Sequence, residues 1–450
     1  MFDVARWARP GVRRREMWSW ALYDFGNSGY TTVVLTAVFN VYFVSVVAAG
    51  EENATFLWTL FIGLSNFLSM LIMPMAGSLA DARATKKRWL LGATLACVLG
   101  TVLLGWSGPG TWLFAGLMLV ISNVGYNMGE SLSSAFLPEL ARPESMGRAS
   151  GWGWGLGYFG GLLALGIALV IVRSAPEAVP HAILWSTAAL YAAAALPLFL
   201  FLKERSRPRE TGAARLTLSG AARSSWAEIL GTLRHIRDFK DFARLSLCGF
   251  FFQSGVSVVI TLAAVYASEV MGFTVEDTLF MIFIVNITAA AGAFGFGHVQ
   301  DRLGHKATLA LTLALWIGMV VTAWFATSRP VFWVAANLAG IAMGACQSAG
   351  RTMVALLAPK SRLAEFFSFW NMALWTASVV GPVTYGAITA VTGGNHRLAI
   401  LSTGCFFVVS LIVLAFIDLE RGRHLAMAIS GGDEGEGDAG GTSPTPEAAR

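Results

Sequence analysis

Long apolar stretches recur along the whole chain, and they limit its possible folds more than any other feature of the sequence. A bilayer core about 30 Å thick is crossed by a helix of about 20 apolar residues, and twelve stretches reach such a length. Helices and closed barrels satisfy every backbone polar group in lipid, but barrel strands alternate polar and apolar residues whereas these stretches are continuously apolar. The sequence therefore predicts an all-α membrane protein with twelve transmembrane helices, near residues 17–47, 55–80, 89–107, 111–137, 150–173, 181–202, 242–269, 275–299, 307–327, 331–357, 365–391 and 396–418.

The composition also indicates that lipid surrounds most of the chain. Hydrophobic residues make up 55% of the 450 residues and charged residues only 13%, whereas a typical soluble domain has about 25% charged residues. The four cysteines lie in apolar stretches with no short pair that could hold a metal, so we expect reduced cysteines, no metal site and no cofactor. They are Cys97, Cys248, Cys346 and Cys405.

A polar segment that begins at Lys203 divides the twelve stretches into two sets of six. Its second half, from Trp226 to Phe239, has apolar residues at helical spacing among basic ones, which is typical of a short helix on the membrane surface. The end of the chain is rich in Gly, Asp and Glu and cannot form a hydrophobic core. We therefore expect a first six-helix bundle over 1–202, a cytoplasmic linker with an amphipathic helix over 203–241, a second bundle over 242–420 and a disordered cytoplasmic tail over 421–450.

The positions of the basic residues predict which side of the membrane each loop faces, because loops rich in Lys and Arg lie on the cytoplasmic side. With a cytoplasmic N-terminus, 28 of the 32 Lys and Arg fall in the N-terminal arm, the even-to-odd loops or the tail. The other four are Arg173, Arg329 and Arg397, which fall on the opposite side, and Arg351, which falls inside a span. Both termini are therefore expected in the cytoplasm. Since this topology accounts for the net charge of +5, no nucleic-acid partner is implied.

The two sets of six helices carry an internal sequence repeat. An offset near 221 residues, as between Gly160 and Gly381, relates several residues in the same order. The related positions include segment 77–81 with 297–301, Lys86 with Lys306, Pro138 with Pro359, Trp154 with Trp375 and, at a slightly longer offset, segment 27–29 with 253–255. Two six-helix repeats are the pattern of a large superfold of secondary transporters.

Two loops resemble the signature loop between helices 2 and 3 of the major facilitator superfamily. The first is segment 77–88, in which Ala82 stands where Arg is usual and Ala84-Thr85 replaces Gly; the second, segment 297–306, is closer to the signature. The matching or loop-basic residues are Gly77, Asp81, Arg83, Lys86 and Lys87 in the first loop and Gly297, Asp301, Arg302, Gly304 and Lys306 in the second. The resemblance implies the major facilitator fold, with two pseudo-symmetric bundles.

Two further segments resemble the vacuole-effluxer family within that superfamily, relatives of the fungal autophagy-linked amino-acid effluxer. They are segment 20–30, in the first span, and segment 137–140 followed by 147–151, between the fourth and fifth spans. The resemblance implies efflux of small solutes, with amino acids the best-known cargo of the eukaryotic members. The short loops favour a bacterial inner-membrane protein, and we expect a monomer.

Three ionisable residues fall clearly inside spans, where a charge is costly unless it is paired or faces water. They are Asp24 in the first span, Glu130 in the fourth and Arg351 in the tenth, and the resemblance places these helices around the central cavity. Glu130 and Arg351 occupy equivalent positions of the repeat, so they could meet as a gate when the halves close. One interpretation makes Asp24 or Glu130 a proton carrier influenced by Arg351. The other is that water or polar neighbours, such as Asn27 beside Asp24, satisfy each group separately.

Polar and aromatic residues of the expected cavity helices are the candidates for substrate binding. Each is equally a candidate for a contact between helices. They are Asn27 and Tyr30 in the first span, Asn123, Tyr126 and Asn127 in the fourth, Gln253 and Ser257 in the seventh, and Gln347 in the tenth.

These features favour a secondary active transporter that moves a small organic solute by alternating access, with protons as a candidate coupling ion. The chain has no ATP-binding signature, and we expect no enzymatic activity. Two alternatives stay open. One is a transporter of lipids or hydrophobic drugs on the same fold, for which the cavity would be apolar and open sideways. The other is a membrane receptor or assembly factor that transports nothing.

Overall fold

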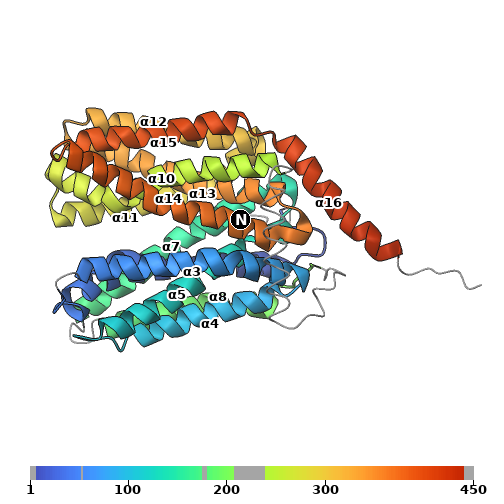
Figure 1. Cartoon of the computed structure of the whole chain (residues 1–450), viewed down its shortest axis with the longest axis horizontal. Helices are drawn as coiled ribbons and strands as arrows, with labels where there is room; N and C mark the ends of the chain where they lie inside the picture. The colour runs from blue at the N-terminus through green and yellow to red at the C-terminus, as the bar shows by residue number, and fades with distance from the viewer. Residues whose placement is uncertain (1–6, 52–53, 175–179, 207–238, 440–450) are drawn as a thin grey trace, which may run out of the picture.

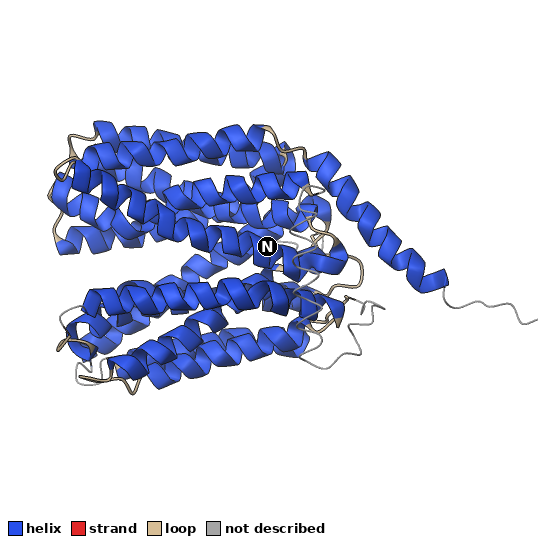
Figure 2. Cartoon of the chain, viewed as in Figure 1, coloured by secondary structure: helices blue, strands red, loops and turns tan. Residues whose placement is uncertain are grey.

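The computed structural model describes residues 7–51, 54–174, 180–206 and 239–439, and nearly all of them are helical (Figure 2). The first half holds α1 (Arg14–Tyr30), η2 (Thr31–Ala37), α2 (Phe39–Tyr42), η3 (Phe43–Val47), α3 (Ala54–Ala82), α4 (Lys86–Leu104), α5 (Trp112–Ser134), α6 (Leu137–Leu140), η4 (Pro143–Ser145), α7 (Met146–Ser174) and α8 (His181–Phe201). The second half holds α10 (Lys240–Met271), α11 (Val275–Leu303), α12 (His305–Phe325), α13 (Arg329–Leu357), η7 (Lys360–Arg362), α14 (Leu363–Val391) and α15 (His396–Ala415), and α16 (Leu419–Ala439) follows it.

Eleven helical segments of the described chain are long and apolar enough to cross a membrane. The twelfth helix of the fold, α5, has 23 residues, but its second half carries Asn123, Asn127 and Glu130. These residues lower the mean hydropathy of α5, and other helices of the bundle cover them. Together these helices make the twelve spans that the sequence predicts.

The chain forms two six-helix halves that meet at one end of the molecule (Figure 1). Helices α1, α3, α4, α5, α7 and α8 form the first half and α10 to α15 the second, and the main contacts between the halves are α7 with α11 and α3 with α14. We call the end at which α1 begins and α15 ends the basic end, because it carries the Lys and Arg of the α3–α4 and α11–α12 connections. The ribbons of the two halves separate toward the opposite end, which we call the outer end.

Equivalent glycines let equivalent helices approach each other in the two halves. A β-carbon built on Gly160 of α7 would lie 1.9 Å from the carbonyl oxygen of Phe25 on α1. One built on Gly381 of α14 would lie 2.0 Å from the carbonyl oxygen of Ser254 on α10. Real β-carbons do not come so close, so a larger residue at either position would force the two helices apart. The sequence repeat thus corresponds to equivalent helix packing.

The C-terminal tail differs from the expectation of disorder after residue 420. Helix α16 covers residues 421–439, for which the expectation is wrong, and residues 440–450 lie outside the described chain. The start of α16 is anchored to α10, since Arg421 donates to the Asp241 carboxylate at 2.7 and 2.8 Å and the backbone N–H of Asp418 donates to it at 2.9 Å. Such a tertiary anchor is not visible in the local composition.

The linker between the halves is described only at its two ends, residues 203–206 and 239–241. The expected surface helix from Trp226 to Phe239 lies outside the described residues, apart from Phe239 itself. The first linker residues lie against the basic end of the first half, where their contacts belong to the site below.

Candidate functional site

One arginine of the second half is bonded to two carboxylates of the first half. Arg351 on α13 donates through Nη1 to Asp24 Oδ2 on α1 at 2.6 Å and through Nη2 to Glu130 Oε1 on α5 at 3.0 Å. The side chains of Arg351 and Asp24 are 5% and 6% exposed, and that of Glu130 is 20% exposed. We call these three residues the charge cluster. With all three groups ionised it carries one negative charge in excess.

Aromatic rings and close helix packing hold the guanidinium of Arg351 in place. Trp20 on α1 and Trp154 on α7 have ring centroids 5.5 and 5.1 Å from its Cζ, within the range of a cation–π interaction. The indole of Trp20 is itself fixed, because Nε1 donates to the carbonyl oxygen of Ser133 at 2.9 Å. On the other side, a β-carbon on Gly153 of α7 would lie 2.5 Å from Asp24 Oδ2. Glycine at this position therefore lets α7 cover the Arg351–Asp24 contact.

Asn27, a candidate for substrate binding, lies beside the charge cluster. Its Nδ2 donates to Glu130 Oε2 at 2.7 Å, so each oxygen of Glu130 accepts a hydrogen bond from a protein donor. Its Oδ1 accepts from the hydroxyl of Tyr191 on α8 at 2.9 Å. Asn27 is buried and hydrogen-bonded through both ends of its amide, so it holds Glu130 in the orientation that faces Arg351.

The two other asparagine candidates bond a neighbouring helix of the same half. Asn123 donates to Ser65 Oγ at 2.6 Å, and Asn127 donates to Ser69 Oγ at 3.0 Å. Both serines lie on α3, and both asparagines are buried. Their geometry is that of polar contacts between membrane helices. The sequence leaves open both this role and substrate binding.

The two tyrosine candidates stack on each other, with ring centroids 5.4 Å apart. Tyr30 is fully buried, and its hydroxyl lies 2.8 Å from Ser122 Oγ. Tyr126 is only half-buried and lies one turn of α5 before Glu130, on the outer side of the charge cluster.

The candidates of the second half form one chain of hydrogen bonds. Gln347 Nε2 donates to Gln253 Oε1 at 3.0 Å, Gln253 Nε2 lies 3.4 Å from Ser257 Oγ, and Ser257 donates to Ser378 Oγ at 3.1 Å. The two glutamines are half-buried. Gln347 lies one turn of α13 before Arg351 and therefore also on the outer side of the charge cluster.

The aspartate of the first signature loop caps a helix of the other half. Asp81 Oδ2, at the end of α3, accepts from the backbone N–H groups of Ala364 at 2.7 Å and Glu365 at 3.2 Å, in the first turn of α14. Gly77 allows this contact, since a β-carbon there would lie 2.7 Å from the carbonyl oxygen of Ala364. The first N–H groups of a helix have no partner within it, and the helix dipole also favours an anion there.

The second signature loop repeats this arrangement with the halves exchanged. Asp301, at the end of α11, accepts from the backbone N–H of Gly147 at 3.1 Å and forms an ion pair with Arg148, both in the first turn of α7. A β-carbon on Gly297 would lie 2.9 Å from the carbonyl oxygen of Gly147. Each half therefore carries one carboxylate that holds a helix of the other half at the basic end.

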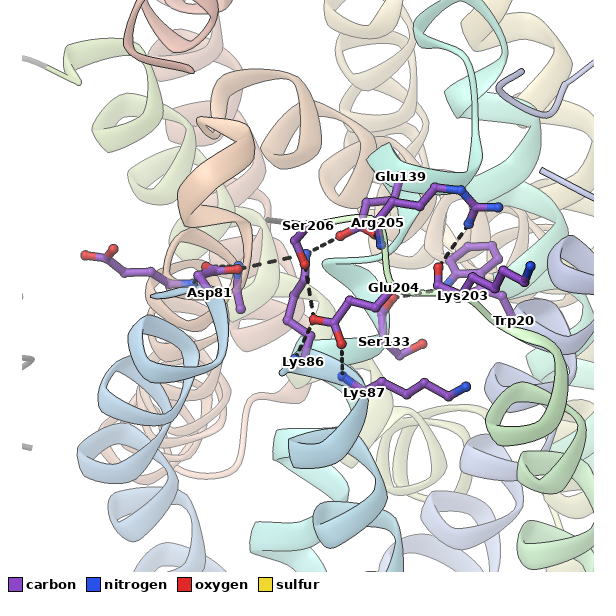
Figure 3. A network of polar contacts seen from close by, with 12 residues as sticks. Trp20, Asp81, Lys86, Lys87, Ser133, Glu139, Lys203, Glu204, Arg205 and Ser206 are labelled. Atoms are coloured by element: carbon purple, nitrogen blue, oxygen red, sulfur yellow. Dashed lines mark hydrogen bonds and ion pairs between the residues drawn. The ribbon is translucent and has the colours of Figure 1, made fainter. Parts of the chain in front are cut away.

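Lys86 links the first signature loop to the start of the linker (Figure 3). Its ammonium group lies 3.9 Å from Asp81 Oδ1 and forms an ion pair with Glu139. Glu139 also accepts from the backbone N–H of Arg205 at 2.9 Å, and Glu204 accepts from the backbone N–H of Lys86 at 2.7 Å. The first linker residues thus take part in the same polar network as the Asp81 cap.

The remaining signature residues have separate surroundings. Lys87 donates to the carbonyl oxygen of Leu202 after α8 at 2.6 Å, and Lys306 donates to that of Ile417 after α15 at 2.7 Å. Each lysine therefore satisfies a carbonyl group just past the last spanning helix of its half. Of the others, Arg83 is half-buried after α3, Arg302 is exposed in the last turn of α11, and Gly304, with φ 88°, precedes α12.

Several residues of these sites were not among the sequence candidates. Glu139 and Arg148 carry a usable signal, because a charge at the end of a span can meet a helix terminus or an opposite charge. Arg205 carries the same signal more weakly, since it is one of several basic residues in the linker. Trp20 and Tyr191 have no local signal that separates them from ordinary buried aromatic residues.

Residues 41–427 match the family described as vacuole effluxer Atg22 like. Among similar proteins, the uncharacterized MFS-type transporter YxiO of Bacillus subtilis (strain 168) is 28% identical over 421 residues, which cover 91% of this chain and 96% of the relative. Autophagy-related protein 22 of Kluyveromyces lactis is 22% identical over 397 residues, which cover 81% of this chain and 80% of the relative.

Solved structures of low sequence identity share the fold. The human organic anion transporter MFSD10 has a TM-score of 0.71 at 16% identity and covers 89% of this chain and 99% of its own. FucP, a major facilitator superfamily transporter in the outward conformation, has a TM-score of 0.68 at 16% identity and covers 90% of this chain and 98% of its own. Since the family match runs through both six-helix halves and the fold is that of the major facilitator superfamily, the chain belongs to the Atg22-like vacuole effluxer family of transporters.

Proposed function

We propose that the protein is a secondary active transporter that exports a small organic solute by alternating access of its two halves. The observation that carries the proposal is the pairing of Arg351 with Asp24 and Glu130, which joins the halves through buried charges. A purely structural contact could be made with apolar residues at lower cost, since desolvation of an ion pair often exceeds its Coulomb energy. Charges that are kept inside a membrane bundle are a functional candidate by default.

In this proposal the charge cluster is the gate at the basic end. The halves cannot separate there unless Arg351 leaves both carboxylates. Separation becomes favourable when water or another group replaces these partners, because an orphan buried charge costs about 3 to 5 kcal/mol. The gate is therefore closed while the basic end is dry and open once solvent reaches it.

Proton binding at Glu130 is the proposed coupling step. One bound proton would neutralise the excess negative charge of the charge cluster. Glu130 is the most exposed member of the cluster and therefore the most accessible to a proton. A neutral Glu130 would hold Arg351 less strongly, so protonation would favour opening of the gate.

The solute would bind on the outer side of the charge cluster, between the halves. Tyr126, Gln253 and Gln347 are half-buried on that side of the charge cluster, and Ser257 extends the hydrogen-bonding chain of the two glutamines. These groups are uncharged and offer donors, acceptors and an aromatic face, which suits a small polar solute. Amino acids are the first class to test, because the sequence resemblance to the vacuole-effluxer family implies them as the best-known cargo of its eukaryotic members.

The test is transport by the purified full-length protein in liposomes with an imposed pH gradient. A panel of amino acids, sugars and hydrophobic drugs is offered, and we expect gradient-dependent flux of at least one small polar solute. Glu130→Gln should abolish the dependence on the gradient, whereas Asp277→Asn, the same chemical change at a half-exposed carboxylate of the outer end, should not.

The alternatives correspond to distinct outcomes of this assay. Flux of drugs or lipids only would favour a transporter of hydrophobic compounds. Flux that does not depend on the pH gradient would contradict proton coupling. No flux of any compound, with a folded protein, would favour a receptor or assembly factor.

A further inference from the structure

A buried chain of hydroxyl groups leads from the charge cluster into the first half. Asn27 Oδ1 lies 2.9 Å from the hydroxyl of Tyr191, which lies 2.9 Å from the hydroxyl of Tyr23. The Tyr23 hydroxyl lies 3.1 Å from Thr94 Oγ1, which lies 2.8 Å from the carbonyl oxygen of Leu90. The chain thus joins α1, α8 and α4 and reaches Glu130 of α5 through Nδ2 of Asn27.

Every side chain of this hydroxyl chain is buried, and the surrounding helices leave it no spare room. Tyr23 and Tyr191 are 0% and 1% exposed, and Asn27 and Thr94 are 2% and 4% exposed. A β-carbon on Gly129, the residue before Glu130, would lie 2.3 Å from the Tyr23 hydroxyl. Because no solvent reaches these groups, each hydrogen must find its acceptor within the chain.

With Glu130 ionised, the hydrogen bonds can run in only one direction near Asn27. Glu130 accepts, so Asn27 must present Nδ2 to it and Oδ1 to Tyr191. An amide oxygen only accepts, so Tyr191 donates its single hydrogen to Asn27. This first setting needs Tyr191 as a donor to Asn27, while Tyr23 donates to Thr94 and Thr94 to the carbonyl oxygen of Leu90. It makes no demand on Tyr23 as an acceptor.

With Glu130 protonated, the same atoms allow a second complete setting. The carboxyl hydrogen needs an acceptor, which Asn27 supplies when its amide turns over and presents Oδ1 to Glu130. Nδ2 then donates to Tyr191, so Tyr191 must donate to Tyr23, Tyr23 to Thr94, and Thr94 to the carbonyl oxygen of Leu90. The second setting therefore needs the whole chain.

We propose that Tyr191, Tyr23 and Thr94 are positioning residues that let Asn27 serve Glu130 in both of its protonation states. The bond between Asn27 and Tyr191 reverses its direction as Asn27 turns, and Tyr191 then donates to Tyr23. A proton can therefore arrive at Glu130 without leaving a buried donor or acceptor unpaired. This inference rests on the proposed proton binding at Glu130. It adds buried groups behind Asn27 that keep every hydrogen bond satisfied when Glu130 binds a proton.

The charged and titratable groups around Glu130 come from several helices. Arg351 of α13 donates to it directly, and the carboxylate of Asp24 on α1 accepts from the same guanidinium. The others are Tyr23 on α1, Tyr126 on α5, Cys97 on α4 and Tyr191 on α8. None of these phenol or thiol groups needs to ionise in either setting, because each setting only moves hydrogens between hydroxyl groups.

The experiment follows the protonation of Glu130 in the intact protein in lipid. The infrared carboxylic C=O band that disappears in Glu130→Gln is measured against pH in the wild type, Tyr23→Phe and Thr94→Val. Tyr23→Phe removes the acceptor of Tyr191 that only the second setting needs, so proton binding should weaken about tenfold, and the pH midpoint of the band should fall by about one unit. Thr94 accepts from Tyr23 in both settings, so Thr94→Val should leave the midpoint unchanged. Tyr266→Phe is the control, because it removes an equally buried hydroxyl, bonded to Ala323, from the other half.

The outcomes separate this inference from the proposed function. A midpoint that is unchanged in Tyr23→Phe, or that moves equally in Thr94→Val or Tyr266→Phe, would overturn the switch of Tyr191 between Asn27 and Tyr23. So would the absence of a Glu130 band over the pH range in which the wild type stays folded. If the midpoints move as expected but transport in liposomes ignores the pH gradient, the chain stands and proton-coupled export is wrong.

Discussion

Arg351 shows at the scale of a residue how one side chain can hold two halves of a molecule together. A guanidinium has five N–H donors in a rigid planar fork, and Arg351 directs its two terminal nitrogens at carboxylates on two different helices. The repeat in the sequence pairs Arg351 with Glu130, because the two occupy equivalent positions. It does not reveal Asp24 as the nearer partner, since the depth of α1 relative to α13 is set by packing between the halves.

The presence of Asp24 decides what an exchange of charges at the gate should do. Glu130→Arg with Arg351→Glu restores one opposite pair, but it also places the new carboxylate against Asp24, whose Oδ2 now lies 2.6 Å from Arg351. We therefore expect the double variant to transport poorly and the triple variant that adds Asp24→Asn to recover part of the flux in liposomes. Equal recovery in the double and triple variants would contradict the role given to Asp24.

A second residue-scale prediction concerns the turn between α3 and α4. Ala84 has φ 50°, and Gly304, at the equivalent place in the second signature loop, has φ 88°. A side chain in the left-handed region costs roughly 1 to 2 kcal/mol, which glycine avoids. Ala84→Gly should therefore raise the midpoint of thermal unfolding in detergent by a few degrees. The unfolding is measured by tryptophan fluorescence.

The matched control for this turn is Ala82→Gly, two residues earlier. Ala82 ends α3, where glycine loses helix propensity and relieves no strain. The control should lower the unfolding midpoint or leave it unchanged. A fall in the midpoint with Ala84→Gly would mean that the turn is not under backbone strain.

At the scale of helices, two ends are stabilised by residues of the opposite half. Asp81 caps α14 and Asp301 caps α7, so each cap exists only while the halves are together at the basic end. A cap within one half, such as Thr274 with Asp277 at the start of α11, is independent of that contact. Caps of the first kind link the stability of a helix end to the conformation of the whole transporter.

Asp81→Asn and Asp301→Asn should each destabilise the arrangement that is closed at the basic end. An asparagine keeps one acceptor but loses the charge that the helix dipole and the paired base favour. We expect lower transport turnover in liposomes with unchanged expression and an unchanged size-exclusion profile. Asp277→Asn weakens a cap that lies within one half and should leave turnover unchanged, so an equal loss in all three variants would mean that the caps serve folding only.

Helices differ in how much of their role the sequence reveals. Hydropathy finds the spans, because each needs about 20 apolar residues, and it finds the charge cluster as an exception within them. It does not distinguish a cavity-lining asparagine from one that bonds a neighbouring helix, as Asn123 and Asn127 of α5 bond serines of α3. Periodicity gives the face of a helix that is polar, whereas the partner of that face depends on which helices pack together. The local composition does not predict helix α16 for a similar reason, because the residue that anchors its start, Asp241, lies far away in the sequence.

At the scale of the whole molecule, the inter-half contacts described above lie on the side of the basic end. The charge cluster, both cross-half caps and the network of Lys86 all lie there, whereas the ribbons of the halves separate toward the outer end (Figure 1). The side of the membrane that the basic end faces therefore fixes the side on which the proposed gate is closed in this state.

Cysteine labelling of the full-length protein in spheroplasts tests that orientation. The background is Cys405→Ser, because Cys405 is the exposed native cysteine and Cys97, Cys248 and Cys346 are buried. Pro109→Cys places a thiol in the exposed α4–α5 connection at the outer end, and Glu144→Cys places one at the exposed basic end. Since basic loops are retained in the cytoplasm, a membrane-impermeant maleimide should label position 109 in intact spheroplasts and position 144 only after permeabilisation. The reverse pattern would put the proposed gate, which is closed in this state, on the external face.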